Sequence, residues 1–293
     1  MTKNEWTCKA ILDWTSEYLE RKRDEHPRLS AEWLLSGVLG LSRIELYTNF
    51  DRPLDSLELA AMHAAIERRV AGEPLQYVTG ETAFRHIVVN CKSGVLIPRP
   101  ETELLVEEVL NHLSAQLNQY PALVLEVGCG TGCVACSLAH ERAKTHVITT
   151  DVSPDAVALA RLNRDKLGLT CLVDVLECDL ASKVDPRLMG HFDALVSNPP
   201  YIPSEVVEEL PYEVSGFEPH LALDGGTDGL DVYRRLLKLA EQALLPGGLF
   251  AVELFETTLE EAAGLAHAQG IWQSIEVHED YTHRPRFLLA VRA

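Results

Sequence analysis

The stretch ALVLEVGCGTGC, from Ala122 to Cys133, decides the fold class. Its first half is a continuous apolar run, as in strands that are buried on both faces of a parallel sheet. Its second half has glycine at positions 128, 130 and 132 and leads into a predicted helix. Open α/β folds bind nucleotide-like cofactors at such a turn between a strand and a helix. We therefore expect a cofactor site there.

Acidic residues follow the next two predicted strands. Asp151 ends one of them, 23 residues after Gly128, so its carboxylate can accept hydrogen bonds from ribose hydroxyls in the same crevice. Asp179, in ECDL, ends the next strand and can face an adenine amino group. The glycine spacing is GxGxG, with Cys133 where a dinucleotide fingerprint needs glycine, which argues against NAD. Each feature alone is an ordinary turn or cap, so the inference depends on their order.

Strands and helices alternate from residue 101 onward. A helix is predicted from Glu101, with Leu105, Val109, Leu113 and Leu117 at i+4 spacing. Further helices are predicted at PDAVALARLNRDKLG and DVYRRLLKLAEQAL. The strands are ALVLEVG, HVITTD, LVDVLEC, FDALVS, GLFAVEL and the two ends of WQSIEVHEDYTHRPRFLLAV. This alternation predicts a mostly parallel, seven-stranded sheet with helices on both faces.

The first 75 residues have a different pattern. Residues 5–75 are predicted to form a small helical bundle, with one helix starting at a Ser30 cap and another at Ser56. Residues 76–100 then change to alternating β-branched residues with glycines and a proline-rich end, which predicts a β-hairpin linker.

The composition favours a cytoplasmic protein. The 293 residues, 46% of them hydrophobic, suffice for two domains with a packed core. No apolar run resembles a signal peptide or a membrane span. Seven scattered cysteines favour reduced thiols. Cys133 and Cys136 form a CxxC without a second ligand pair, so we interpret them as small buried residues and expect no metal.

Negative charge is concentrated after residue 75. The net charge is −18; residues 1–75 hold ten Lys and Arg against thirteen Asp and Glu, so residues 76–293, with 16 against 31, carry −15. Proteins that bind nucleic acid normally carry basic patches, which argues against such a partner. Residues 202–233 contain eight carboxylates and no Lys or Arg, forming either a solvated acidic surface or a docking site for a basic protein.

The strand FDALVS is followed by Asn198, Pro199, Pro200 and Tyr201. The prolines cannot donate backbone hydrogen bonds, so the strand ends there rigidly. If this strand lies beside ALVLEVG, the Asn198 oxygen and the Pro199 carbonyl offer two acceptors to one planar NH2 group near the cofactor. Tyr201 can stack on a flat amide or base. An ordinary proline turn is the alternative. No His or Lys in the motif looks like a general base, so orientation in a dry site should provide most of the rate.

These features together resemble the class I S-adenosylmethionine-dependent methyltransferases, which have a Rossmann-like fold. In that family the glycine loop passes the methionine moiety, one acid holds the ribose and the other lies by the adenine. The cofactor is a sulfonium, which Glu126 would suit by its charge. Leu180 stands where some relatives carry Trp. The resemblance implies a cofactor site formed by Gly128, Cys129, Gly130, Thr131, Gly132, Asp151, Asp179, Leu180 and Asn198.

Three segments are similar to the release factor glutamine methyltransferase family: PLQYVTGETAF (74–84), LIPRPETE (96–103) and GFEPHLALDGGTDGLDVYRRL (216–236). Its members methylate N5 of the glutamine in the GGQ motif of class 1 peptide chain release factors. The resemblance implies an N-terminal helical substrate-recognition domain at 1–73, a β-hairpin linker at 74–98 and an S-adenosylmethionine-dependent catalytic domain at 99–293. Asn198, Pro199, Pro200 and Tyr201 would hold the glutamine amide, with Asn198, Pro199 and Tyr201 catalytic.

The same resemblance implies class 1 release factors as partners. From the charge and the apolar runs we expect no direct nucleic-acid or membrane partner, and nothing in the sequence requires more than a monomer. VELFETT (252–258) and DYTHRPRF (280–287) depart from the family's usual turns, which leaves their contacts open. Arg99 and Glu101 either help to order the methionine end of the cofactor or form a structural salt bridge. Two rival functions remain: methylation of adenine N6 or cytosine N4 in nucleic acid, and a non-catalytic cofactor-binding module, against which the intact Asn198 and Tyr201 speak.

Overall fold

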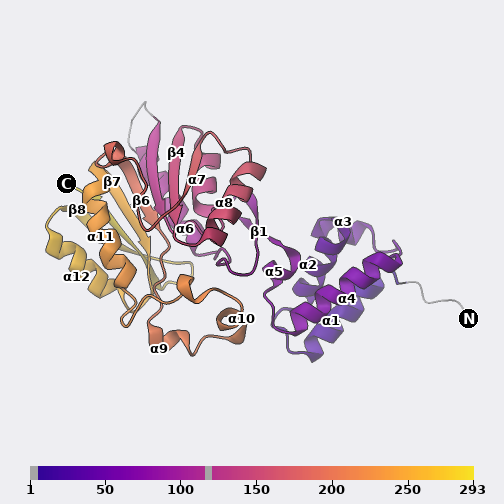
Figure 1. Cartoon of the computed structure of the whole chain (residues 1–293). Coiled ribbons are helices and arrows are strands. Elements are labelled where there is room, and N and C mark those ends of the chain that lie inside the picture. The colour runs from indigo at the N-terminus through magenta and orange to yellow at the C-terminus, as the bar shows by residue number, and fades with distance from the viewer. Residues whose placement is uncertain (1–5, 116–120) are drawn as a thin grey trace, which may run out of the picture. The chain divides into compact units, whose positions relative to one another are not determined.

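The computed structural model describes residues 6–115 and 121–293, which form two compact units (Figure 1). The first unit contains the chain up to Glu81 together with Tyr212–Phe217. The second contains Thr82–Pro211 and Glu218–Ala293. Leu117, expected in the last turn of a helix, lies outside the described residues.

The first unit is helical, as expected. Its helices are α1 (Cys8–Arg21), α2 (Pro27–Leu39), α3 (Arg43–Thr48), α4 (Ser56–Val70) and α5 (Leu75–Thr79). The helix α4 begins at Ser56 as predicted, because the side chain of Asp55 caps it by accepting hydrogen bonds from the amides of Leu57 and Glu58. The buried core comprises Cys8, Ile11, Leu12, Leu19, Ala31, Leu34, Leu35, Leu46, Leu54, Met62 and Ile66.

The predicted Ser30 cap is wrong. The helix α2 starts three residues earlier, at Pro27, whose fixed φ suits the first helical position and whose missing N–H would have no partner there. Ser30 instead lies inside the helix, and its hydroxyl donates a hydrogen bond to Asp24. A proline upstream thus outweighed a serine as the start signal.

The second unit is built on a seven-stranded sheet. Its strands are β3 (Ala122–Val127), β4 (Thr145–Asp151), β5 (Val173–Glu177), β6 (Phe192–Ser197), β7 (Leu244–Glu253), β8 (Trp272–Glu279) and β9 (Pro285–Arg292). They run in the order β5-β4-β3-β6-β7-β9-β8. The first five are mutually parallel, whereas β9 is antiparallel to both β7 and β8. The predicted mostly parallel, seven-stranded sheet is confirmed.

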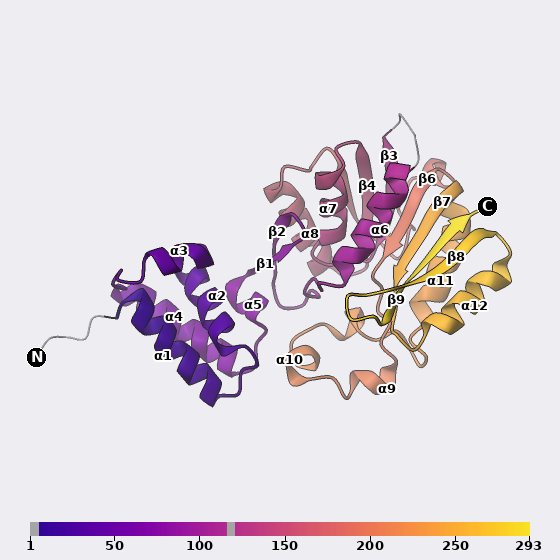
Figure 2. The same ribbon diagram turned by 180° about the vertical axis from the view of Figure 1, so that it is seen from behind.

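Helices cover both faces of this sheet (Figures 1 and 2). Alternate strand residues face opposite layers: Val124 joins the core under α6 (Thr102–Ala115), α7 (Cys133–Glu141) and α8 (Pro154–Lys166). Its neighbour Leu125 joins the core under α11 (Asp231–Ala243) and α12 (Leu259–Gln269). Burial on both sides explains why the strands read as continuous apolar runs. Short helices α9 (Ser204–Val207) and α10 (Tyr212–Ser215), with 3-10 turns at Pro186–Leu188 and His220–Ala222, lie in the connections.

A hairpin precedes the sheet. Its strands β1 (Glu81–Phe84) and β2 (Ile87–Asn90) form a separate two-stranded sheet. The side chains of Phe84, Ile87 and Val89 are buried in the core that also contains α6, α7 and α8. Of the residues expected to form the linker, Leu75–Thr79 are helical and the hairpin occupies 81–90.

Asn163 on α8 ties this hairpin to the glycine-rich turn. Its side chain is fully buried. Its Oδ1 accepts hydrogen bonds from the backbone and side-chain nitrogens of Asn90, both at 2.8 Å. Its Nδ2 donates to the carbonyls of Asn90 at 3.1 Å and Thr131 at 2.9 Å. One buried carboxamide therefore pairs with polar groups on two segments that are far apart in the sequence.

Within the described residues, no helix combines the length and the apolarity that a bilayer crossing requires.

The Asn163→Ala variant should lose about 3 kcal/mol of unfolding free energy, because the half-buried backbone groups of Asn90 and the buried carbonyl of Thr131 lose their partners. Urea unfolding followed by circular dichroism measures the change. Leu162→Ala is the matched control, since Leu162 is the preceding residue on α8 and is 55% exposed. Equal stability of both variants would contradict the clamp.

Candidate active site

A cavity of about 210 Å³ opens where the parallel strands end. The turn after β3, the ends of β4, β5 and β6, and the loop after the hairpin all line it. Parallel strands place their carboxyl ends on one edge of the sheet, so residues from separate stretches of sequence meet here. The cavity therefore lies where the glycine turn and the NPPY segment predicted a site.

The glycine turn has a backbone conformation that residues with a side chain rarely adopt. Gly128, Gly130 and Gly132 have φ values of +86°, +49° and +79°, all in the left-handed region. A Cβ on Gly132 would also lie 3.1 Å from the Cα and the Cβ of Ala160 on α8. A side chain on Gly130 would meet nothing within 4 Å, so glycine keeps the space beside the cavity clear. The GxGxG spacing thus follows from backbone conformation and helix packing.

Asp151 is fixed against this turn. Its Oδ2 accepts a hydrogen bond from the amide of Gly130 at 3.1 Å, and its Oδ1 accepts one from the amide of Ser153 at 2.9 Å. Asp151 also lines the cavity. The carboxylate is therefore oriented by backbone donors on both sides, and it remains on the cavity wall where a ribose was expected.

Asp179 and Leu180 lie at the end of β5. Both line the cavity, and Leu180 has a left-handed φ of +46°, which is unusual for a residue with a side chain. The carboxylate of Asp179 pairs with the guanidinium of Arg235 on α11 at 2.5 Å. Arg235 itself lines the cavity, a contact that the sequence did not suggest.

The structure brings most of the predicted site residues together. Gly128, Gly130, Asp151, Asp179, Leu180, Asn198, Pro199 and Pro200 line the cavity. In the described part of the chain, the lining leaves out Cys129, Thr131, Gly132 and Tyr201. The first three belong to the turn that shapes the wall, and Tyr201 lies one residue beyond it.

The NPPY segment leaves the sheet directly beside the glycine turn. The strand β6 pairs with β3 in parallel, with Ser197 opposite Val127. The hydroxyl of Ser197 donates a 2.7 Å hydrogen bond to the carbonyl of Val127. The last residues of both strands are thereby joined, and this contact sets Asn198 next to Gly128. The predicted adjacency of these two strands is confirmed.

Backbone contacts from residues 223–229 hold Tyr201 and Ile202. The amide of Ile202 donates to the carbonyl of Leu223, and the amide of Gly225 donates to the carbonyl of Ile202. A Cβ on Gly225 would lie 2.8 Å from the Cα of Tyr201, and one on Gly229 would lie 2.4 Å from its carbonyl oxygen. Only glycine fits at both positions, which explains why this segment is glycine-rich.

Two polar residues behind the NPPY segment escaped the sequence analysis. Thr102, at the start of α6, and Glu253, at the end of β7, are 2% and 1% exposed. The Nδ2 of Asn198 donates to the Thr102 oxygen at 3.0 Å, and the Thr102 hydroxyl donates to Glu253 at 2.7 Å. The Tyr201 hydroxyl donates to the other oxygen of Glu253 at 2.9 Å. The sequence signal that could have identified Glu253 is a carboxylate at the end of the strand that lies beside FDALVS.

Comparisons with known proteins agree with this geometry. Residues 10–80 match the PrmC N-terminal domain family, and residues 101–210 match the methyltransferase small domain family. A release factor glutamine methyltransferase of Geobacter sulfurreducens is 43% identical over 265 residues, covering 90% of each chain. One from Rhodopirellula baltica is 36% identical over 289 residues, covering 98% of this chain and 97% of the relative. The chain belongs to the release factor glutamine methyltransferase family.

A solved structure supports the fold alone. The N-terminal domain of human METTL16 in complex with SAH aligns with a TM-score of 0.54 at 15% identity, covering 77% of this chain and 83% of that one. The class I methyltransferase fold expected for this release factor glutamine methyltransferase family member is thus confirmed.

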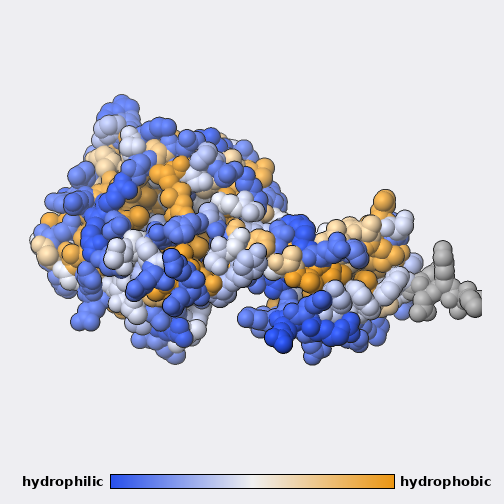
Figure 3. All heavy atoms as spheres, turned by 60° about the horizontal axis from the view of Figure 1, so that its bottom comes forward, coloured by the Kyte–Doolittle hydropathy of each residue, from blue (hydrophilic) through white to orange (hydrophobic). Residues whose placement is uncertain are grey.

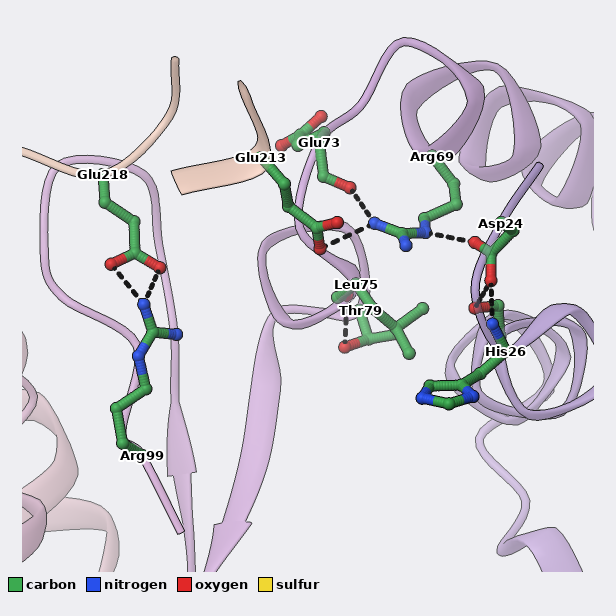
Figure 4. A network of polar contacts seen from close by, with 10 residues as sticks. Asp24, His26, Arg69, Glu73, Leu75, Thr79, Arg99, Glu213 and Glu218 are labelled. Atoms are coloured by element: carbon green, nitrogen blue, oxygen red, sulfur yellow. Dashed lines mark hydrogen bonds and ion pairs between the residues drawn. The ribbon is translucent and has the colours of Figure 1, made fainter. Parts of the chain in front are cut away.

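Two ion pairs involve the acidic segment of this family member (Figure 4). In the second unit, both oxygens of the buried Glu218 accept hydrogen bonds from Arg99, at 2.7 and 2.8 Å. Arg99 thus forms the salt bridge that was one of its two expected roles. In the first unit, Arg69 pairs with Asp24 at 2.7 Å and with Glu213 at 2.8 Å. Part of the acidic segment is therefore neutralised within the protein.

The cysteines of this release factor glutamine methyltransferase family member are packed in its core. Cys133 and Cys136 are 8% and 0% exposed and lie in the cluster beneath α6 and α7, which confirms their interpretation as buried residues. Burial raises the pKa of both thiols, to about 12 for Cys136, so they remain protonated at neutral pH. Across residues 6–115 and 121–293, no group of three or more His, Cys, Asp or Glu side chains could hold a metal ion.

Glu126 carries less charge than expected. Burial, with a smaller contribution from the Asp151 charge, raises its pKa to about 8, although the hydroxyl of Thr149 donates a hydrogen bond to it. The carboxyl is therefore mostly neutral at pH 7. The full negative charge expected on Glu126 is therefore not present at pH 7 in the protein by itself.

This shift predicts how stability depends on pH. Between pH 4.5 and pH 8 the folded protein keeps a proton on Glu126 that the unfolded chain has lost, so stability falls as the pH rises. The Glu126→Gln variant has no ionisable group at this position. Its unfolding free energy relative to wild type should increase by on the order of 4 kcal/mol across this window. Urea unfolding at both ends measures it, with the exposed Glu205→Gln as control; parallel pH profiles would refute the assignment.

Proposed function

We propose that this protein transfers a methyl group from S-adenosylmethionine to N5 of the glutamine in the GGQ motif of class 1 peptide chain release factors. The observation that carries the proposal is the side chain of Asn198, anchored through its nitrogen and lining the cavity beside the glycine turn. Membership of the release factor glutamine methyltransferase family selects glutamine among the amino groups that such a site can hold.

The residues of the cavity fit S-adenosylmethionine. The glycine turn keeps one wall open, Asp151 presents an oriented carboxylate, and Asp179 and Leu180 form the wall at the end of β5. We propose that Asp151 holds the ribose, that Asp179 and Leu180 lie by the adenine, and that residues 128–132 pass the methionine moiety. When bound, the cofactor supplies an electrophilic methyl group on a sulfonium.

The protein contributes orientation to the reaction. Because Asn198 uses its nitrogen to donate to Thr102, its Oδ1 remains available as an acceptor. In the proposed complex, this oxygen and the Pro199 carbonyl accept the two protons of the glutamine NH2 group, so the nitrogen is held in one orientation. Pro200 keeps the strand end rigid, and Tyr201 packs against the flat amide. Orientation in a site that excludes water then lowers the barrier.

We propose that residues 1–73 recognise the release factor, that residues 74–98 link this domain to the catalytic domain, and that residues 99–293 catalyse the methyl transfer. Support for a binding role of the first unit comes from its surface, where Figure 3 shows hydrophobic residues gathered on the visible face. Large apolar side chains that are at least about a third exposed in the described part of this unit are Trp6, Trp14, Leu29, Trp33, Ile44, Tyr47, Leu57 and Tyr212. Such exposure favours a protein partner.

The net charge of −18 supports a monomer that repels nucleic acid, and we propose both properties. We also propose that the protein acts in the cytoplasm, where release factors work. A DNA or RNA gel shift at moderate salt would expose the rival nucleic-acid function.

The reaction itself is tested by mass spectrometry of a purified release factor after incubation with the protein and S-adenosylmethionine. One methyl group should appear on the GGQ glutamine, and none on a release factor with alanine in its place. Asn198→Ala should lower turnover by about 100-fold or more, because one of the two amide acceptors is lost. Its affinity for S-adenosylhomocysteine, measured by calorimetry, should stay within about threefold. Wild-type turnover of the variant would exclude the proposed role.

The acidic segment should attract a basic substrate. We expect the GGQ region to be basic, because it works against ribosomal RNA, and Glu205, Glu208 and Glu209 are exposed after the NPPY segment. Changing all three to lysine should slow association by about tenfold at low salt and flatten its salt dependence, as measured by stopped-flow fluorescence. The same charge change at the exposed Glu241, Glu260 and Glu279 is the control. Equal effects of both triple variants would rule out local steering.

A further inference from the structure

Glu253 lies behind the amide site with both carboxylate oxygens in use. Its Oε2 accepts a hydrogen bond from the Thr102 hydroxyl at 2.7 Å, and its Oε1 accepts one from the Tyr201 hydroxyl at 2.9 Å. The Thr102 oxygen accepts a further bond from the Nδ2 of Asn198 at 3.0 Å. One buried carboxylate thus connects to both ends of the NPPY motif.

The charged end of this network sets the direction of every hydrogen bond in it. When Glu253 is ionised, its oxygens can only accept, so Thr102 and Tyr201 then both donate to it. A threonine hydroxyl has one proton, so the oxygen of Thr102 is left to accept from Asn198. The NH2 end of the Asn198 carboxamide therefore points toward Thr102. Its oxygen is at the opposite end and is free for the substrate.

We propose that Glu253 is a positioning residue that, through Thr102, holds the carboxamide of Asn198 with its oxygen toward the substrate and, directly, holds the ring of Tyr201. This inference deepens the proposed function and rests on it. The two ends of a carboxamide are similar in size, so sterics alone do not choose between them. Without an acceptor at Thr102, the NH2 group of Asn198 would face the substrate NH2 group in part of the molecules, donor against donor.

The groups around Glu253 come from several elements. Thr102 on α6 and Tyr201 after β6 donate to it, Arg286 on β9 is a nearby positive charge, and Glu101 before α6 is a nearby negative charge. Arg286 also pairs with the buried Asp280 at 3.3 Å. Burial outweighs the hydrogen bonds and raises the pKa of Glu253 above 4.5. On acidification, Glu253 should therefore gain its proton at a higher pH than an exposed glutamate, and the fixed direction is then lost.

The decisive comparison is wild type with Glu253→Gln in the full chain. Glutamine has the same shape, but its NH2 group must donate to Thr102 or Tyr201, which disrupts one of the two bonds. We expect kcat for release factor methylation to fall 10- to 100-fold, with KM for S-adenosylmethionine within threefold. The kcat of wild type should fall on the acidic side, and this limb should be missing in the variant. Glu256→Gln, three residues along the chain and paired with Arg284, is the control that should leave kcat unchanged.

A second pair of variants keeps the inference testable if Glu253→Gln does not fold. Thr102→Ser retains the hydroxyl and should retain at least half of the wild-type kcat. Thr102→Val has a similar volume without the hydroxyl and should match the loss expected for Glu253→Gln. Tyr201→Phe removes only the other bond and should leave the orientation of Asn198 unchanged. Equal kcat for the serine and valine variants would overturn the relay.

An activity-independent measurement separates this inference from the proposed function. The side-chain NH2 resonances of Asn198, assigned by NMR against Asn198→Ala, should shift with pH in wild type and stay constant in Glu253→Gln. If wild type failed to methylate release factors but this titration were present, the proposed substrate would be wrong and the positioning role would stand. If methylation occurred but the resonances titrated identically in both proteins, the positioning role would be wrong.

Discussion

The parallel pairing of β3 with β6 is the constraint on which the site depends. It places the residue after Val127 and the residue after Ser197 side by side, and the Ser197 hydroxyl joins the two strand ends at 2.7 Å. The glycine turn and the NPPY segment, about 70 residues apart in the chain, therefore meet at one edge of the sheet. A cofactor in the crevice and an amide at Asn198 would then be neighbours without any loop having to move.

Two networks of buried polar groups lie around this edge of the sheet, one at Asn163 and one at Glu253. Asn163 satisfies groups on the hairpin and on the glycine turn, so the wall of the cavity is tied to the segment that leads into it. Glu253 and Thr102 pair behind the amide site in the same way. An unpaired buried group costs free energy, so each network favours a single arrangement of its side chains. In the proposed function, the orientation of the substrate amide depends on these buried hydrogen bonds.

The segment after the NPPY motif contributes residues to both compact units. Gly225 and Gly229 allow this segment to approach the backbone of Tyr201 closely, because a side chain at either position would collide with that backbone. Further along the same segment, Tyr212–Phe217 belong to the helical unit, where Glu213 pairs with Arg69. Glu218 then pairs with Arg99 in the sheet unit. These ion pairs hold the segment at defined points, so part of its negative charge is structural, whereas Glu205, Glu208 and Glu209 remain exposed.

The sequence by itself determined the helical first part, the alternating second part, the seven strands and the approximate site, because hydrophobic periodicity and glycine and proline positions are local properties of the chain. It also determined that Asp151 ends a strand and that Asn198 follows one, and hence that both lie at the same edge of the sheet. Tertiary structure alone decided the partners of Asn198, the neutral state of Glu126 and the pairing of Asp179 with Arg235. Each of these depends on which side chain from a distant part of the sequence is buried beside the residue, and the local sequence pattern does not contain that information.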